Sequence, residues 1–270
     1  PKAQQGLQSF LDDHHLVAIC EVDTRALVSY IRDNGSMNAV ISTETDDLEV
    51  LKARLNEIPN MKGLELASKV STTKPYFFGN PEAKYKVAAL DFGIKRNILR
   101  HLASRDIYVK VFPYNTPLAE LKAWNPDGYF LSNGPGDPDL CQDAVNILRQ
   151  QMNKSRKPIC GICMGNQLMA KAGGANIYKL KYGHRSHNQP VRMIGTDKCY
   201  ITSQNHGYAV DASTLDKDWS ELFVNMNDGS NEGVRHNTNP WFTSQFHPEA
   251  CSGPVDTLFM FDLFVEKLTL

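Results

Sequence analysis

The fold is decided by the stretch Pro158-Ile159-Cys160-Gly161-Ile162-Cys163-Met164-Gly165-Asn166-Gln167. It begins as a short apolar strand at residues 158–160, turns at the two glycines, and continues as a helix through residues 166–171. Glycine lets a backbone bend sharply and approach its neighbours closely at such a turn. A buried strand that runs directly into a helix is the repeating unit of α/β sheets, so we expect this fold class.

The same alternation of strand and helix runs along most of the chain. Apolar runs predict strands at residues 87–90, 108–112 and 129–131, and helical patterns between and after them include residues 98–102, 117–124 and 145–148. Beyond residue 175 the expected strands are shorter and more alternating, at residues 200–203, 223–226 and 241–246, before a last helix at 255–267. We therefore predict a doubly wound, mostly parallel sheet with antiparallel additions.

A polar stretch with Pro and Gly around residues 71–81 indicates a linker, which we place at residues 73–84. The main domain is then expected at residues 85–270. Residues 1–72 show two short strands, at 16–20 and 37–41, and two helices, one starting at Asp23 or Thr24 and one at 47–58. This is little strand for an independent fold, so we expect the C-terminal part of a larger, truncated α+β domain.

Composition excludes several classes of protein. The 270 residues carry 29 Lys and Arg against 30 Asp and Glu, and no dense basic run, which disfavours nucleic acid as a partner. No apolar run has the length of a membrane span, and the N-terminus lacks the apolar core of a signal peptide. Six cysteines are too few for a disulfide scaffold. We expect a cytoplasmic protein with a free thiol.

Cys163 is the candidate for that thiol. Gly161-Ile162-Cys163-Met164-Gly165 has the Gly-x-nucleophile-x-Gly pattern of a strand-to-helix elbow, with Cys in place of Ser. The amides at the N-terminus of the following helix favour a thiolate. A buried structural Cys is the alternative, and the strand–turn–helix context favours the nucleophile.

Cys160 and Cys163 also form a Cys-x-x-Cys pair, which is typical of zinc or redox sites. Zinc would need a second close pair, and the other cysteines are isolated along the chain. In a thioredoxin-like motif the first Cys starts the helix, whereas Cys160 ends the strand. We expect Cys160 to be a core residue and the chain to hold no metal.

His247 is the candidate base for the thiol. It follows the predicted strand at 241–246, and Glu249 lies two residues later across Pro248, on the same side of an extended segment. The carboxylate can then fix the tautomer of the imidazole. A purely structural His–Glu contact is the alternative. The remaining histidines are expected at the surface or in loops, His184 and His187 in one loop and His206 in a turn.

A third loop follows the strand at 129–131 and reads Asn133-Gly134-Pro135-Gly136-Asp137-Pro138. Because the carboxyl ends of parallel strands meet at one edge of a sheet, this loop and the elbow share a crevice. A glycine N–H here and the amide of Met164 could bind the oxyanion of a tetrahedral intermediate. The chain contains no Walker lysine pattern, which disfavours ATP binding by a P-loop.

These motifs, at 133–138, 161–167 and 245–249, resemble in this order those of the triad glutamine amidotransferases. Three further stretches narrow the resemblance to the small subunit of glutamine-hydrolysing carbamoyl phosphate synthetase: residues 21–25, 90–99 and 203–210. The similarity covers essentially the whole chain.

The resemblance implies a role for each residue of the site. Cys163 would be the nucleophile, His247 the acid and base, and Glu249 its orienting group, while Gly134 and Met164 would supply oxyanion amides. The positions that match glutamine-binding residues are Gly136, Gln167, Asn205, Gly207 and Tyr208. It also implies no cofactor in this chain, glutamine as substrate, and a large subunit with ATP and magnesium that receives ammonia through a tunnel.

The chain departs from the family in two places. Asn166 stands where the family commonly has His, and a glutamine-contacting Ser of the N-terminal portion has no counterpart. We expect glutaminase activity to survive because His247 is retained. Two alternatives stay open: a glutaminase subunit for anthranilate or GMP synthesis, and a catalytically weakened regulatory subunit. The sequence does not choose between pyrimidine and arginine synthesis.

Overall fold

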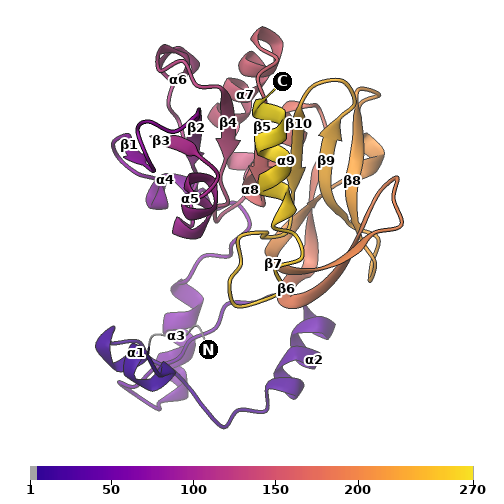
Figure 1. The fold of residues 1–270 in the computed structure, drawn as a ribbon. Coiled ribbons are helices and arrows are strands. Elements are labelled where there is room, and N and C mark those ends of the chain that lie inside the picture. Colours follow the sequence, from indigo (N-terminus) through magenta and orange to yellow (C-terminus); the bar gives the residue numbers. More distant parts are fainter. Residues whose placement is uncertain (1–4, 270) are drawn as a thin grey trace. The chain divides into compact units, whose positions relative to one another are not determined.

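A computed structural model describes residues 5–269 (Figure 1). It divides into two compact units between Met61 and Lys62. The domain boundary expected from composition, at residues 73–84, stays a prediction. Part of that expected linker is β1 (Tyr76–Phe78), which pairs antiparallel with β3 (Ile107–Pro113) in the larger unit. Aromatic side chains in this short segment favour an edge strand over a free linker.

The larger unit contains one ten-stranded sheet among the described residues, in the order β1-β3-β2-β4-β5-β10-β9-β8-β6-β7. Besides β1, its strands are β2 (Tyr85–Asp91), β3 (Ile107–Pro113), β4 (Gly128–Leu131), β5 (Ile159–Ile162), β6 (Ile177–Met193), β7 (Cys199–Val210), β8 (Trp219–Asn225), β9 (Asn231–His236) and β10 (Trp241–Ser244). Five consecutive strands, from β3 to β10 in this order, are parallel, and the others pair antiparallel. The predicted α/β class and the antiparallel additions are confirmed, in a mixed sheet.

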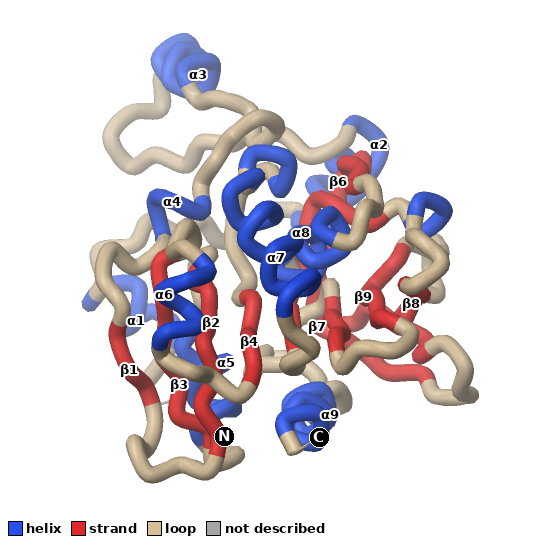
Figure 2. The backbone as a smooth tube through the Cα atoms, turned by 90° about the horizontal axis from the view of Figure 1, so that it is seen from above, coloured by secondary structure: helices blue, strands red, loops and turns tan. Residues whose placement is uncertain are grey.

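Helices cover both faces of the parallel strands. They are α4 (Ala67–Val70), α5 (Arg96–Ala103), α6 (Leu118–Ala123), α7 (Gln142–Lys154), α8 (Met164–Ala172) and α9 (Phe259–Leu268). One core lies under α6, α7 and α8, and the other lies under α5 and α9. Figure 2 shows α7 and α8 on one side of the parallel strands and α9 on the other. This is the doubly wound arrangement.

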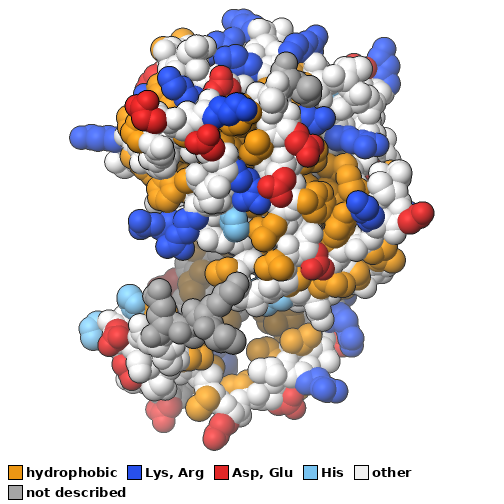
Figure 3. All heavy atoms as spheres, viewed as in Figure 1, with side chains coloured by type: hydrophobic (Ala, Val, Ile, Leu, Met, Phe, Trp, Pro, Cys, Tyr) orange, Lys and Arg blue, Asp and Glu red, His pale blue; other side chains and the backbone are white. Residues whose placement is uncertain are grey.

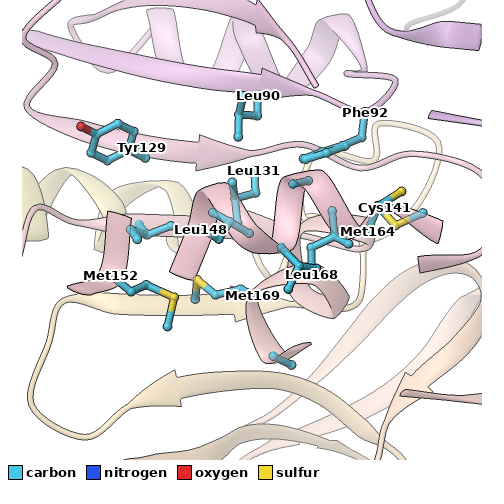
Figure 4. Packing of buried hydrophobic residues seen from close by; sticks show 14 of the residues in the cluster. Leu90, Phe92, Tyr129, Leu131, Cys141, Leu148, Met152, Met164, Leu168 and Met169 are labelled. Atoms are coloured by element: carbon cyan, nitrogen blue, oxygen red, sulfur yellow. The ribbon is translucent and has the colours of Figure 1, made fainter. Parts of the chain in front are cut away.

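Each parallel strand contributes side chains to both cores, because successive side chains point to opposite faces of the sheet. In β2, Leu90 belongs to the core under α7 and α8, whereas Ala89 belongs to the opposite core. Figure 4 shows Leu90, Leu131 of β4, Leu148 of α7 and Leu168 of α8 in one packed layer. Burial of one such Leu contributes about 1.5–3 kcal/mol, so this layer fixes α8 and the turn before it.

The hairpin of β6 and β7 differs from the sequence expectation. Residues 182–188 were expected as a loop and 204–208 as a turn, but both lie in paired strands, with His184 opposite His206. Irregular register between Lys179 and His184 interrupts the ladder. The segments lack an apolar alternation because several of their polar side chains are buried against other polar groups, so the usual strand signal is missing.

The smaller unit contains α1 (Leu7–Asp13), α2 (Thr24–Asn34) and α3 (Leu48–Glu57). The helix expected to start at Asp23 or Thr24 and the helix expected at 47–58 are confirmed, with Asp23 and Asp47 as N-caps. The strands expected at 16–20 and 37–41 are wrong: residues 5–61 contain helices and no strand. A strand needs a hydrogen-bonded neighbour and a core to cover, and these apolar segments have neither here, since Leu16 and Ile19 are exposed.

The larger unit presents both signs of charge. In Figure 3, Lys and Arg side chains are interspersed with Asp and Glu on its visible face. Within residues 5–269, no helix has the length and apolar character needed to cross a membrane.

Candidate active site

Cys163 lies on a strained turn between β5 and α8. Its φ of 55° and ψ of −102° fall in a region that non-glycine residues rarely adopt. The flanking glycines are required by close packing: a Cβ on Gly161 would lie 2.7 Å from the carbonyl oxygen of Gly165, and one on Gly165 would collide with Leu131. The expected strand–turn–helix elbow is therefore present.

Strand pairing brings His247 to this turn. β5 and β10 are parallel neighbours, with Ile162 opposite Ser244, and the N–H of Cys163 donates to the Ser244 carbonyl at 2.8 Å. His247 follows Ser244 by three residues, and the Cys163 side chain is near enough to raise the pKa of the imidazole. Both side chains are buried, at 5% exposure each.

Glu249 orients the imidazole of His247. Its Oε1 lies 2.7 Å from Nδ1, so Nδ1–H donates to the carboxylate and Nε2 is left for the sulfur. Burial lowers the pKa of His247, but Cys163 and Glu249 raise it more, to about 9. Burial raises the pKa of Glu249, while His247 and Lys95 bring it below its ordinary value. The charged forms of this pair stabilise each other.

Lys95 is a member of the site that sequence reasoning missed. Its Nζ lies 3.1 Å from Glu249 Oε1 and 3.2 Å from His247 Nδ1, and its side chain is about half exposed. A signal was available, because Lys95 closely follows the carboxyl end of β2 at the edge where ligands bind in such sheets.

Two backbone amides are free to bind an oxyanion. Met164 is the first residue of α8, so its N–H has no intrahelical acceptor, and none is found for the N–H of Gly134 among residues 5–269. Gly134 also lies so close to Phe92 that a Cβ would collide with the Phe92 carbonyl. The oxyanion role of both amides stays a prediction.

A pocket of about 550 Å³ opens beside the His–Glu pair. Asn205, His247 and Glu249 line it, and Lys95 and Arg185 contribute positive charge to its wall. Such a polar pocket suits a small zwitterion.

Of the other predicted substrate residues, Gln167 and Tyr208 are buried, while Gly136 and Gly207 are partly exposed. The hydroxyl of Tyr208 donates a hydrogen bond to Asp137, the residue after Gly136, at 3.0 Å. Burial and the Asp137 carboxylate together raise the pKa of Tyr208. Gln167 donates to the Tyr208 carbonyl at 3.1 Å. Gly207 precedes Tyr208 on β7, and a Cβ there would lie 3.6 Å from Arg185. The pocket lining does not include Cys163, the predicted oxyanion residues Gly134 and Met164, or the predicted substrate residues Gly136, Gln167, Gly207 and Tyr208.

Asn166 is a structural residue in this arrangement. It is fully buried, donates to Gln245 Oε1 at 2.9 Å and accepts from the Thr243 hydroxyl at 2.5 Å. Its side chain therefore ties α8 to β10 directly behind the elbow.

The two other buried cysteines among residues 5–269 are poor candidates for chemistry. Burial raises the pKa of Cys160 well above its ordinary value and that of Cys141 to about 11, so both remain thiols at neutral pH. The structure also gathers His184, His206 and Glu232, whose ligand atoms lie within 4.8 Å of one another. Their spacing along the chain gave no signal of this cluster.

The family model described as glutamine amidotransferase class-I matches residues 88–267. The chain therefore belongs to the class I glutamine amidotransferases. A second model, the CPSase domain of the carbamoyl-phosphate synthase small chain, matches residues 1–41.

Curated relatives define the family further. Proteins named carbamoyl phosphate synthase arginine-specific small chain are 48% identical in Neurospora crassa and 47% identical in Chaetomium globosum, and each match covers 99% of this chain. Within its class, the chain thus belongs to the carbamoyl phosphate synthase small chains. It spans 58% and 57% of the length of these two relatives.

A solved structure agrees on the fold. The chain superposes on a putative GMP synthase protein of Thermoplasma acidophilum with a TM-score of 0.58 and 24% identity, over 68% of this chain and 92% of the other.

Proposed function

We propose that this chain hydrolyses glutamine to glutamate and ammonia through a thioester on Cys163. One observation carries the proposal: Cys163 stands on a strained turn within reach of His247, which is itself hydrogen-bonded to Glu249. A nucleophile, a base and an orienting carboxylate in this order are what acyl transfer requires.

In the first half of the reaction, the Cys163 thiolate attacks the side-chain carbonyl carbon of glutamine. A C–S bond forms, and the oxyanion is held by the amides of Gly134 and Met164. The imidazolium of His247 gives its Nε2 proton to the leaving nitrogen, the C–N bond breaks, and ammonia leaves a γ-glutamyl thioester.

In the second half, neutral His247 takes a proton from water, and the hydroxide attacks the thioester carbon. The C–S bond breaks, glutamate leaves, and the thiolate and imidazolium are restored. Asn205, which lines the pocket, would contact the amino acid. A substrate role for Gly136, Gln167, Gly207 and Tyr208 stays a prediction, because these residues lie outside the pocket lining.

We further propose that the ammonia passes to a large, ATP- and magnesium-dependent subunit that makes carbamoyl phosphate. The relatives' name, small chain of carbamoyl phosphate synthase, supports a larger assembly, and its arginine-specific designation favours arginine synthesis.

The test is synthesis of carbamoyl phosphate by the complex of both subunits with two nitrogen donors. Cys163→Ser should abolish synthesis from glutamine and leave synthesis from free ammonia. Cys160→Ser, three residues away on β5, is the matched control and should retain both. Normal glutamine-dependent synthesis by Cys163→Ser would contradict the proposal.

A further inference from the structure

A buried polar cluster lies behind the strand that borders the substrate pocket. It contains His184 of β6, Gln204 and His206 of β7, and Glu232 of β9, all of them buried. Asp228, in the turn between β8 and β9, reaches the cluster from its partly exposed edge. The two imidazole rings pack edge to face at 4.8 Å between centroids.

Hydrogen bonds determine the charge of His184. Its Nε2 lies 2.8 Å from a carboxylate oxygen of Asp228, and its Nδ1 lies 3.1 Å from Glu232 Oε1. A neutral imidazole has one N–H and cannot donate to carboxylates from both nitrogens. Burial lowers the pKa of His184, but Glu232 and Asp228 raise it to about 9, so the ring is an imidazolium at neutral pH.

Glu232 depends on this positive charge. Its side chain is fully buried, and its Oε2 has no hydrogen-bond partner among the described residues. Burial raises the pKa of Glu232, but His184 and His206 keep it below its ordinary value. Removing the cation from a buried ion pair strongly destabilises the fold. The imidazolium of His184 and the carboxylate of Glu232 therefore stabilise each other's charged form.

The cluster fixes the edge of the pocket through β7. Gln204 accepts from His184 at 2.8 Å, and His206 donates from Nδ1 to the Tyr208 carbonyl at 2.8 Å. Asn205 lies between Gln204 and His206 on the strand and lines the pocket. Among residues 5–269, no side-chain hydrogen bond or ion pair of the cluster reaches Cys163, so its influence should fall on substrate binding.

The same side chains have the composition of a metal site, but their separations fit protons better. Nδ1 of His184 lies 2.8 Å from Gln204 Oε1 and 3.1 Å from Glu232 Oε1, which are ordinary N–H···O distances. A proton on each ring nitrogen of His184 satisfies all of these contacts.

We propose that His184, paired with Glu232 and Asp228, is a positioning residue for glutamine that holds Gln204 and His206 and thereby fixes Asn205 at the pocket. The inference rests on the proposed function, because it takes glutamine as the ligand of that pocket.

The first test compares His184→Gln with the double variant His184→Gln/Glu232→Gln in the full chain. The single variant removes the imidazolium that is hydrogen-bonded to buried Glu232 and should raise the KM for glutamine about tenfold, with kcat within about twofold. The double variant replaces the ion pair by two amides and should return KM to within about threefold. His236→Gln, at a half-buried histidine of β9 outside the cluster, is the control and should leave KM unchanged.

Glutamine affinity is also measured by calorimetry in the Cys163→Ser background, which needs no turnover. If His184→Gln does not fold, Asp228→Asn at the exposed edge should weaken binding about threefold. If the variants change glutamine affinity as expected but the wild-type chain does not hydrolyse glutamine, the positioning role is supported and the proposed reaction is contradicted.

Three results would overturn the positioning role. The first is an unchanged glutamine affinity in folded His184→Gln, and the second is a double variant that is no better than the single one. The third is one equivalent of zinc in the purified chain whose removal by a chelator weakens glutamine binding, since a metal would then hold the cluster.

Discussion

Lys95 and His247 share one oxygen of Glu249: Nζ lies 3.1 Å from Oε1 and Nδ1 lies 2.7 Å from the same atom. The other carboxylate oxygen has no hydrogen-bond partner among residues 5–269. Glu249 thus joins two cations at one point, one from the loop after β2 and one from the loop after β10. This contact ties the loop after β2, which is separated from β10 by β4 and β5, to the candidate catalytic pair.

Lys95→Met should lower kcat for glutamine hydrolysis. It removes one of the charges that hold Glu249 ionised and in place, and because Lys95 is half exposed, the loss should be about two- to fivefold. Lys95→Arg should retain most of the rate. Steady-state kinetics of both variants measure this, and an unchanged kcat in Lys95→Met would show that the contact is incidental.

The stability of the larger unit should fall as pH rises above neutrality. The pKa of His247 is about 9 in the folded chain against an ordinary 6.5, so the folded state holds a proton that the unfolded state loses. The stabilisation is complete below about pH 6.5 and disappears as pH rises through 9. Denaturant unfolding of His247→Gln from pH 6 to 10 should show a shallower decline than wild type. A parallel decline would contradict the raised pKa.

Gly165→Ala should be strongly destabilising. The added Cβ would collide with the backbone of Leu131, which cannot move away without disturbing β4, and overpacking of this kind costs about 1–3 kcal/mol or more. Gly6→Ala, where nothing lies within 4 Å of the added atom, should change the free energy of unfolding little. Equal free energies of unfolding for the two variants would contradict the close packing of Gly165 against Leu131.

Asn166→Ala should weaken the fold more than the chemistry. It removes hydrogen bonds to Gln245 and Thr243 and leaves buried polar groups unpaired, at a cost of about 1–3 kcal/mol. Labelling of Cys163 by a glutamine-like electrophile should persist at low temperature. Loss of labelling in a folded variant would give Asn166 a role in the reaction itself.

The parallel sheet was predictable because β2, β4 and β5 are apolar on both faces and alternate with amphipathic helices. The contact of His247 with Glu249 was predictable from local geometry, since two residues apart on an extended segment face the same way. The relation of Cys163 to His247 depends on the parallel pairing of β5 with β10, which the motifs suggest and periodicity does not specify.

Other features left no local signal. The β6–β7 hairpin buries the polar side chains of His184, Gln204 and His206. Its sequence therefore predicts polar loops at these positions instead of strands. Residues 16–20 have strand composition but no neighbouring strand, which a local pattern cannot reveal. For Lys95, its place just after β2 was a signal, but its contact with Glu249 depends on the assembled sheet edge.

The central claim is that Cys163 forms a covalent glutamyl intermediate. Mass spectrometry of the acid-quenched chain during turnover of glutamine tests it most directly. The account predicts a glutamyl adduct on the peptide that contains Cys163, localised to that residue by fragmentation and absent in Cys163→Ser. An adduct on Cys160, or steady hydrolysis by Cys163→Ser with no adduct, would contradict it.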